Sequence, residues 1–67
     1  MNVSVNNVVV EVTSGATILD VPLVSGLPTF AGLAIAVNET IVPRDRWGDY
    51  QLQPSDKIIL IRATQGG

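Results

Sequence analysis

Residues 1–13 alternate between apolar and polar side chains with a period of two. Such alternation is typical of strands that bury one face. Asn6 and Asn7 interrupt it with two residues that tolerate positive φ, as a tight hairpin turn requires. The pattern therefore predicts a β-hairpin over residues 1–13, in which Glu11 of the returning strand faces water.

The segment after the hairpin predicts a short or kinked helix. Thr17 and Asp20 have the spacing of a capping box with Thr17 as the N-cap. Pro22 then lies beyond the first turn, where the lost backbone hydrogen bond costs about 3 kcal/mol. If Asp20 is the N-cap instead, Pro22 falls harmlessly in the first turn, but the helix is very short before Gly26 and Pro28. Both alternatives stay open.

Two later stretches are apolar at every position. Residues 33–37 read Leu-Ala-Ile-Ala-Val and residues 58–61 read Ile-Ile-Leu-Ile, which is typical of strands buried on both faces. Residues 38–40 predict a turn after the first of these strands. A brief return strand follows at residues 41–42, and Pro43 ends it because proline cannot donate a ladder hydrogen bond.

The chain between these strands predicts only short elements. Residues 44–48 suit a single helical turn or a tight loop, with Trp47 folded back over the edge of the core. Residues 50–52 predict one more short edge strand. Residues 53–56, Gln-Pro-Ser-Asp, have the composition of a turn that leads into the final strand.

Together these elements predict one α+β domain. Right-handed crossover rules place the helix over one face of a single sheet, with the first and last strands side by side and parallel at its centre. This is the β-grasp, or ubiquitin-like, architecture: a mixed sheet of four to five strands with one short helix packed on one face. We expect residues 1–63 to form this domain and residues 64–67 to form a flexible C-terminal Gly-Gly tail.

The composition leaves little catalytic chemistry to this chain. It has no cysteine and no histidine, which excludes a Cys–His pair, a Ser–His–Asp triad and a zinc site built from thiolate or imidazole ligands. Its acidic residues fall at predicted turns, strand ends or solvent faces, and we interpret them as solvated surface charges: Glu11, Asp20, Glu39, Asp45, Asp49 and Asp56. We therefore expect no catalytic residue, no metal site and no enzymatic activity.

Charge and hydropathy limit the classes of partner. The 67 residues carry a net charge of −2 with only four basic residues, which argues against binding to a nucleic-acid backbone. No apolar run is long enough to span a bilayer, and Met1 leads directly into the strand pattern rather than into a signal sequence. We expect a cytoplasmic protein that is a monomer when free and has no nucleic-acid or membrane partner.

Three segments resemble those of the thiamine biosynthesis sulfur carrier proteins, the ThiS family, which have a ubiquitin-like fold. The first is Leu-Ala-Ile-Ala-Val-Asn over residues 33–38, followed by Val-Pro-Arg-x-x-Trp over residues 42–47. The second is the Ser-Asp turn at residues 55–56, and the third is the ending Arg-Ala-Thr-Gln-Gly-Gly over residues 62–67. The Val-Pro-Arg-x-x-Trp arrangement is the most specific of these. Residues 18–27 depart from the family, which usually has a regular helix without proline there.

The resemblance implies a carrier of sulfur. An adenylyltransferase related to the ubiquitin-activating enzymes, using ATP and Mg²⁺, would adenylate the carboxylate of Gly67. A sulfur donor, a cysteine desulfurase or a rhodanese-like protein, would displace AMP and leave a thiocarboxylate, from which thiazole synthase takes the sulfur. Thr64, Gln65 and Gly66 would thread the partner's active site, since a glycine without Cβ fits a narrow channel. The chain itself would bind no cofactor.

The resemblance also implies a docking surface. In ubiquitin-like folds, partners dock on the face of the sheet that the helix leaves uncovered. Alternate residues of a strand point to opposite faces, so we expect an exposed apolar patch at Ile59, Ile61 and Ala63. Arg62 then lies at the rim of the covered face, with its charge able to reach water. Alternatively, loops cover both faces of the sheet.

Other functions stay open at this point. The small subunit of molybdopterin synthase has the same fold and the same Gly-Gly thiocarboxylate, although those chains usually run longer. A ubiquitin-like protein modifier would link Gly67 to lysines by isopeptide bonds, and a plain binding module would have an inert terminus. Arg44 and Arg46 could steer the domain toward an acidic partner surface, but isolated arginines near a turn are more often solvated.

Overall fold

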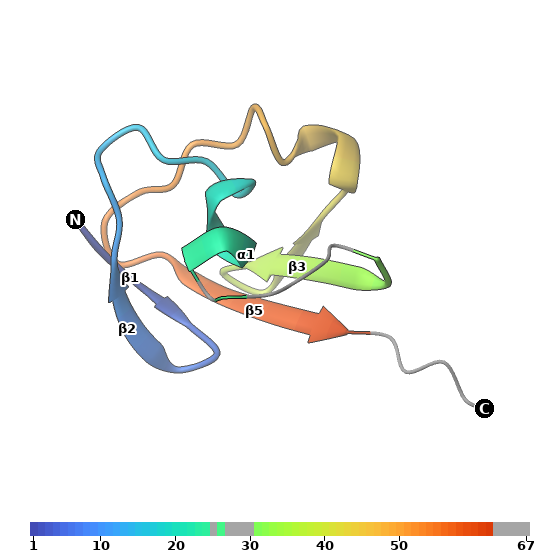
Figure 1. Ribbon diagram of the computed structural model, residues 1–67, viewed down its shortest axis with the longest axis horizontal. Helices are drawn as coiled ribbons and strands as arrows, with labels where there is room; N and C mark the ends of the chain where they lie inside the picture. Colours follow the sequence, from blue (N-terminus) through green and yellow to red (C-terminus); the bar gives the residue numbers. More distant parts are fainter. Residues whose placement is uncertain (25, 27–30, 63–67) are drawn as a thin grey trace.

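A five-stranded mixed sheet forms the body of the protein, in the order β2-β1-β5-β3-β4. The computed structural model describes residues 1–24, 26 and 31–62. β1 and β5 pair in parallel at the centre, and the other neighbouring strands are antiparallel (Figure 1). The elements are β1 (Asn2–Val5), β2 (Val8–Glu11), α1 (Asp20–Val24), β3 (Leu33–Val37), β4 (Thr40–Val42), the 3₁₀ turn η1 (Arg44–Arg46) and β5 (Lys57–Arg62). The predicted topology is confirmed.

Both hairpins of the sheet close through two-residue turns with positive φ. Asn6 and Asn7 have φ of 50° and 68°, and Asn38 and Glu39 have φ of 50° and 73°. Two consecutive residues in this region give the type I′ geometry, whose twist matches that of the flanking strands. The predicted hairpin over residues 1–13 is confirmed, as is the turn that follows β3.

The helix α1 combines features of the two expected alternatives: it is as short as the one with Asp20 as the N-cap, and it has the Thr17–Asp20 contact of the capping box. It has only five residues, and Pro22 lies in its first turn, where a missing backbone N–H leaves no helical bond unmade. Asp20 is the first helical residue rather than the N-cap. Its Oδ2 accepts a hydrogen bond from the backbone N of Thr17 at 2.9 Å, so the carboxylate closes the turn that precedes the helix.

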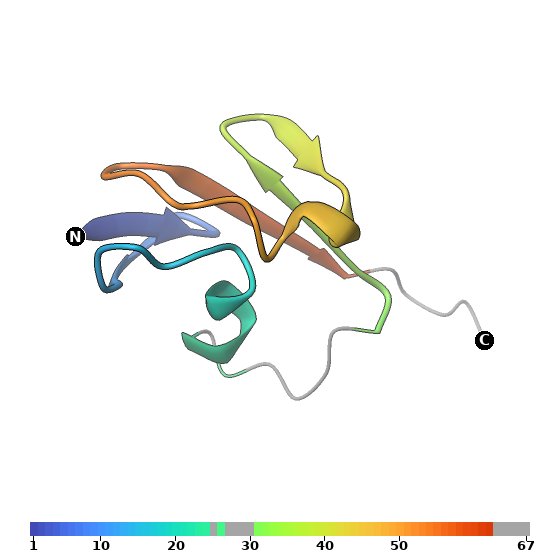
Figure 2. The same cartoon turned by 90° about the horizontal axis from the view of Figure 1, so that it is seen from above.

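The core lies between the sheet and α1, which covers one face of the sheet (Figure 2). We call this the inner face and the opposite one the outer face. The buried core includes residues of four strands, α1 and the loops: Val3, Val5, Leu33, Ile35, Val37, Val42, Ile58, Val21, Ile18, Trp47 and Leu52. Trp47 is 1% exposed, and its Nε1 donates a hydrogen bond to the carbonyl of Val42 at 2.9 Å. The expected edge residue is thus part of the core.

Two sequence-based expectations about strands are wrong. Residues 50–52 form no strand of the sheet, because this segment pairs with the loop before α1 through a single bridge between Gln51 and Thr17. β5 is not buried on both faces along its length: Ile58 is fully buried, but Ile61 is 47% exposed. Among the described residues, the segments that cover the sheet lie on the inner face, so an apolar side chain on the outer face of β5 stays in contact with water.

Candidate functional site

The expected site residues divide between the end of the chain and the last strand. Ala63, Thr64, Gln65, Gly66 and Gly67, together with the expected boundary at residue 63, lie outside the described residues. The described chain ends at Arg62, the last residue of β5. The site is therefore built from the contacts that hold β5 and from the surface beside it.

The start of β5 is held by a buried carboxylate. Asp56 is only 7% exposed, so its interpretation as a solvated charge is wrong. Its Oδ2 accepts a hydrogen bond from the backbone N of Gln53 at 2.8 Å, and its Oδ1 accepts one from Nδ2 of Asn38 at 3.0 Å. Buried charge is tolerated when its lone pairs are satisfied in this way. The carboxylate thus joins the turn before β5 to the turn after β3.

Two asparagines hold β5 from opposite sides. Asn38 donates its backbone N–H to the carbonyl of Lys57 at 2.8 Å and accepts the N–H of Lys57 on Oδ1 at 3.0 Å. Asn6 donates its backbone N–H to the carbonyl of Ile58 at 2.9 Å and accepts the N–H of Leu60 on Oδ1 at 2.8 Å. Each turn therefore continues the hydrogen bonding of its hairpin onto the central strand.

The last part of β5 is accompanied mainly by β3. The register of β1 with β5 covers Ser4 to Lys57 and Val5 to Ile58. The register of β3 with β5 continues to the pair of Leu33 and Arg62. The fold thus fixes the position and direction of the chain up to Arg62.

The outer face carries an apolar surface across β5, β3 and β4. Along β5, Ile61 is 47% exposed and Ile59 is half-buried. In the register, Ile59 lies opposite Ala36, Ala36 lies opposite Ile41 of β4, and Ile61 lies opposite Ala34. Ile41 is 56% exposed. We call these five residues the outer patch, in which Ala36 lies between Ile41 and Ile59 and is only 7% exposed: Ala34, Ala36, Ile41, Ile59 and Ile61.

Sequence reasoning found Ile59 and Ile61 of this patch and missed Ile41. The signal was present, since the alternation of Thr40, Ile41 and Val42 puts the middle residue on the opposite face from Val42. Val42 is buried on the inner face and Ile41 is exposed. The sequence-based prediction does not say which face of the sheet the side chains of residues 41–42 occupy, so it does not include Ile41 in the patch.

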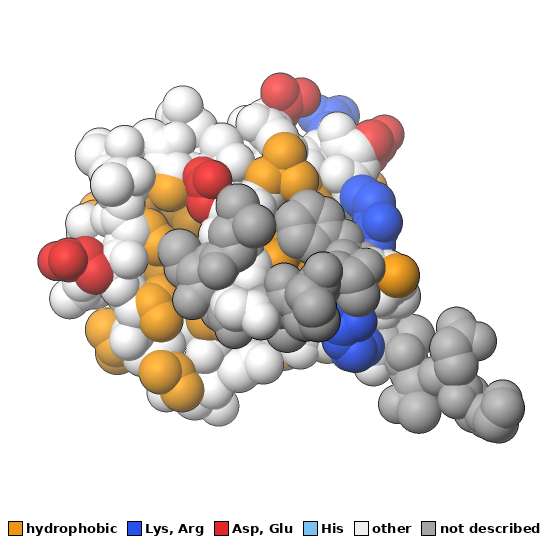
Figure 3. Space-filling view, viewed as in Figure 1, with side chains coloured by type: hydrophobic (Ala, Val, Ile, Leu, Met, Phe, Trp, Pro, Cys, Tyr) orange, Lys and Arg blue, Asp and Glu red, His pale blue; other side chains and the backbone are white. Residues whose placement is uncertain are grey.

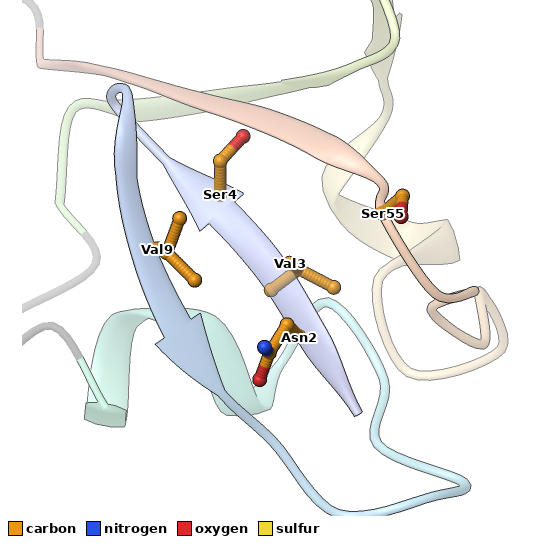
Figure 4. Close-up of a pocket in the computed structure, with 5 residues that line it drawn as sticks. All are labelled: Asn2, Val3, Ser4, Val9 and Ser55. Carbon is orange, nitrogen blue, oxygen red and sulfur yellow. The ribbon is translucent and has the colours of Figure 1, made fainter.

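A hollow of about 340 Å³ lies on the outer side of the first hairpin, away from the end of β5 (Figure 4). Its lining comes from β1, β2 and the turn before β5, and consists of Asn2, Val3, Ser4, Val9 and Ser55. None of these side chains is ionisable, so they supply no acid or base. Among the described residues, no group of three His, Cys, Asp or Glu could hold a metal ion. No helix of the described chain has the length and hydropathy needed to cross a membrane.

Comparisons with known proteins agree with this architecture. The sequence model of the ThiS family matches residues 1–67. The sulfur carrier protein ThiS of Escherichia coli (strain K12) is 43% identical over 37 residues, which is 55% of this chain and 56% of that protein. The crystal structure of the thiamine biosynthesis protein (ThiS) from Geobacter metallireducens superimposes with a TM-score of 0.83 over the full length of both chains, at 14% identity. At that identity the structural likeness supports the fold alone.

Proposed function

Because the chain belongs to the ThiS family, we propose that it is a sulfur carrier protein of thiamine biosynthesis rather than an enzyme. The observation that carries this proposal is the family match, which spans all 67 residues and therefore includes Gly66 and Gly67. The aligned part of the E. coli protein covers little more than half of that relative. The activity and the partners of this chain are accordingly proposals.

The proposed reaction takes place at the carboxylate of Gly67. A carboxylate is a poor electrophile, so an adenylyltransferase of the ubiquitin-activating type first joins it to the α-phosphate of ATP and releases pyrophosphate. Hydrosulfide then attacks the acyl carbon and AMP leaves, whereas a persulfide on a cysteine desulfurase or a rhodanese-like donor gives an acyl disulfide that a thiol reductant cleaves. The product is a thiocarboxylate, which passes its sulfur to thiazole synthase. ATP and Mg²⁺ are used by the partner, and the chain binds neither.

The body and the tail have different roles in this proposal. Residues 1–63 form the folded domain, and residues 64–67 form the tail. Thr64, Gln65 and Gly66 thread the partner's active site and bring Gly67 to its reactive centre. Glycine suits the last two positions because, without Cβ, it fits a narrow channel. The hydrogen bonds from Asn6 and Asn38 to β5 support this division, because they hold the strand that leads to the tail.

The outer patch is the proposed docking surface of the partners. Ile59 and Ile61 were expected there together with Ala63, and the structure adds Ile41 to the same face. An exposed apolar surface of this kind on a small protein usually marks an interaction site. Since the partners consume ATP, we place the chain in the cytoplasm, as a monomer when free.

Intact-mass measurement tests the proposal. The chain is incubated with its adenylating partner, ATP, Mg²⁺ and a sulfide source. We expect a mass increase equal to the difference between a sulfur and an oxygen atom. Gly67→Ala should abolish this increase. Gly48→Ala is the matched control, because its added methyl meets only the end of the Leu19 side chain, at 3.2 Å, and lies on an exposed loop.

Intact mass separates the carrier from a binding module and from a protein modifier, and a sulfur-transfer assay separates the two kinds of carrier. An unchanged mass with a verified, active partner would contradict the carrier proposal and favour a plain binding module. Recovery of Gly67 linked to lysines of other proteins would identify a protein modifier. Transfer of the sulfur to molybdopterin synthase rather than to thiazole synthase would identify the alternative carrier.

A further inference from the structure

Charged side chains are unevenly placed along β5. Glu11 lies opposite Asn2 in the hairpin register, and Glu39 lies in the turn after β3. Both are at the end of the sheet where β5 begins, and the basic residue Lys57 lies at the same end. Arg62 closes β5 at the other end. In Figure 3, basic side chains lie along the side of the molecule toward which β5 points in Figure 1, and acidic side chains lie beside the upper ones.

Two arginines contact the same short segment at that basic end. Nη1 of Arg62 donates to the carbonyl of Ala31 at 3.2 Å, and Arg62 is the register partner of Leu33. Nη2 of Arg44 donates to the carbonyl of Leu33 in a longer contact of 3.4 Å. Both arginines are exposed residues. Their guanidinium groups therefore both lie beside the start of β3, at the end of the sheet where β5 ends.

Arg44 is further oriented by an aromatic ring. Its guanidinium carbon lies 5.1 Å from the centroid of Trp47, and Trp47 is fixed in the core by its hydrogen bond to Val42. A cation over an aromatic face is held by the ring's negative potential. A side chain that is oriented before binding loses less conformational entropy in a complex. Arginine also matches a carboxylate with two parallel hydrogen bonds.

We propose that Arg44 and Arg62 form a basic docking site for an acidic protein surface, the one around the active-site entrance of the adenylating partner. This inference rests on the proposed function. Ala63 follows Arg62 directly in the chain, so a partner that engages the two arginines receives the tail in the same approach. Of the two alternatives that the sequence leaves open for Arg44, a solvated charge or steering toward an acidic partner surface, the proposal follows the second.

An acidic protein surface fits better than a nucleic acid. The net charge of −2 and the four basic residues of the whole chain give too small a basic footprint for a phosphate backbone. η1 also carries Asp45 between Arg44 and Arg46, so the local excess of positive charge is modest. Such a charge orients an encounter and raises the association rate more than it raises the final affinity.

A pair of matched charge reversals tests the site. Arg62→Glu and Lys57→Glu change exposed residues at the two ends of the same strand and alter the net charge equally. The assay measures ATP-dependent pyrophosphate release by the adenylating partner as a function of carrier concentration. We expect Arg62→Glu to raise KM about ten-fold, and Arg44→Glu/Arg62→Glu further, with kcat unchanged. Lys57→Glu should stay close to the unmodified chain.

Ionic strength supplies the second measurement. Raising the salt concentration shortens the range of electrostatic attraction, so kcat/KM of the unmodified chain should fall toward that of Arg62→Glu. Arg44→Lys/Arg62→Lys should recover part of the lost efficiency. The emission of Trp47, the sole tryptophan of the chain, and the thermal midpoint verify that each variant is folded.

Three results would overturn the inference. If Lys57→Glu and Arg62→Glu raised KM equally, the effect would depend on the net charge of the chain and not on a site at Arg62. An unchanged KM in the folded double variant would exclude the site, and so would a defect that salt does not diminish. Absence of pyrophosphate release with the unmodified chain and an active partner would instead refute the proposed function itself, and with it this inference.

Discussion

The Asn6-Asn7 and Asn38-Glu39 turns contact β5 from opposite sides and use the same device. In each turn the first residue is an asparagine with φ of 50°. It donates its backbone N–H to a carbonyl of β5 and accepts an N–H of β5 on its side chain. They differ in one bond. Asn38 also donates Nδ2 to the buried carboxylate of Asp56, and the structure assigns Asn6 no equivalent acceptor among the described contacts.

This difference shows that two asparagines with the same backbone conformation can contribute differently to the free energy of unfolding. The Leu60 N–H that Asn6 satisfies is at an exposed position, where water can replace the asparagine oxygen. The Asp56 oxygen that Asn38 satisfies belongs to a residue that is 7% exposed. A buried acceptor that loses its donor bears the full desolvation penalty. Four predictions, taken from the largest expected effect to the smallest, test this interpretation.

Asp56→Ala should have the largest effect. It leaves the backbone N of Gln53 and the Nδ2 of Asn38 without their acceptor, and we expect a loss of about 2–3 kcal/mol in the free energy of unfolding. Urea denaturation followed by the fluorescence of Trp47 measures it. A loss below about 1 kcal/mol would mean that water replaces the carboxylate, and the distinction between the two turns would lose its basis.

Asn38→Gly should have the next largest effect. Glycine accepts φ of 50° without strain, so this change removes the side chain and spares the turn geometry. Both Oδ1 and Nδ2 partners are lost, on Lys57 and Asp56, and we expect a loss of about 1.5–2 kcal/mol. Asn38→Ala should be worse still, because alanine is strained at positive φ. The reverse order would show that the positive φ at residue 38 does not strain alanine, and an unchanged stability of Asn38→Gly would show that the side chain contributes nothing.

The coupling between Asn38 and Asp56 should be smaller but measurable. A double-mutant cycle with Asn38→Gly and Asp56→Ala isolates the interaction between the two side chains, and we expect about 1 kcal/mol of non-additivity. The matched cycle combines Asn6→Gly with Asp56→Ala, which share no contact, and should be additive. Equal coupling in both cycles would point to a general loosening of β5 rather than to the bond between the two residues.

Asn6→Gly should have the smallest effect. Only the acceptor of the Leu60 N–H is removed, water reaches the site, and we expect a loss of about 0.5–1 kcal/mol. Amide hydrogen exchange gives a finer measurement, since the Leu60 amide should exchange faster while amides at the start of β5 are unaffected. Protection of Leu60 equal to that in the unmodified chain would show that the side-chain bond contributes nothing.

The parts of the fold that depend on neighbouring residues could be predicted from the sequence. The two asparagines at residues 6–7 predicted the first turn, and the apolar run at residues 33–37 predicted β3, because positive φ and burial leave a direct mark on residue type. The position of Pro22 narrowed the helix to two alternatives, and the structure has a short helix with Pro22 in its first turn. Topology followed from element order and the rules for connections.

The parts that depend on distant residues could not be predicted. Asp56 looks like a turn residue in the sequence, and its burial depends on Asn38, eighteen positions earlier. Residues 50–52 have the composition of a strand, yet they pair with the loop at Thr17. In the candidate site, the alternation along β5 predicted which side chains face outward, but the contribution of Ile41 required the register across β3.

The parallel alignment of β1 and β5 has a mechanical consequence. A pull on the chain beyond Arg62 acts along β5, so its hydrogen bonds to β1 and β3 are loaded together in shear instead of being unzipped one after another. The hydrogen bonds from the backbone of β5 to the side chains of Asn6 and Asn38 are loaded in the same direction. The domain should therefore resist mechanical unfolding from its C-terminal end. An unfolding enzyme that pulls on this end should pause at the sheet before the sheet unfolds.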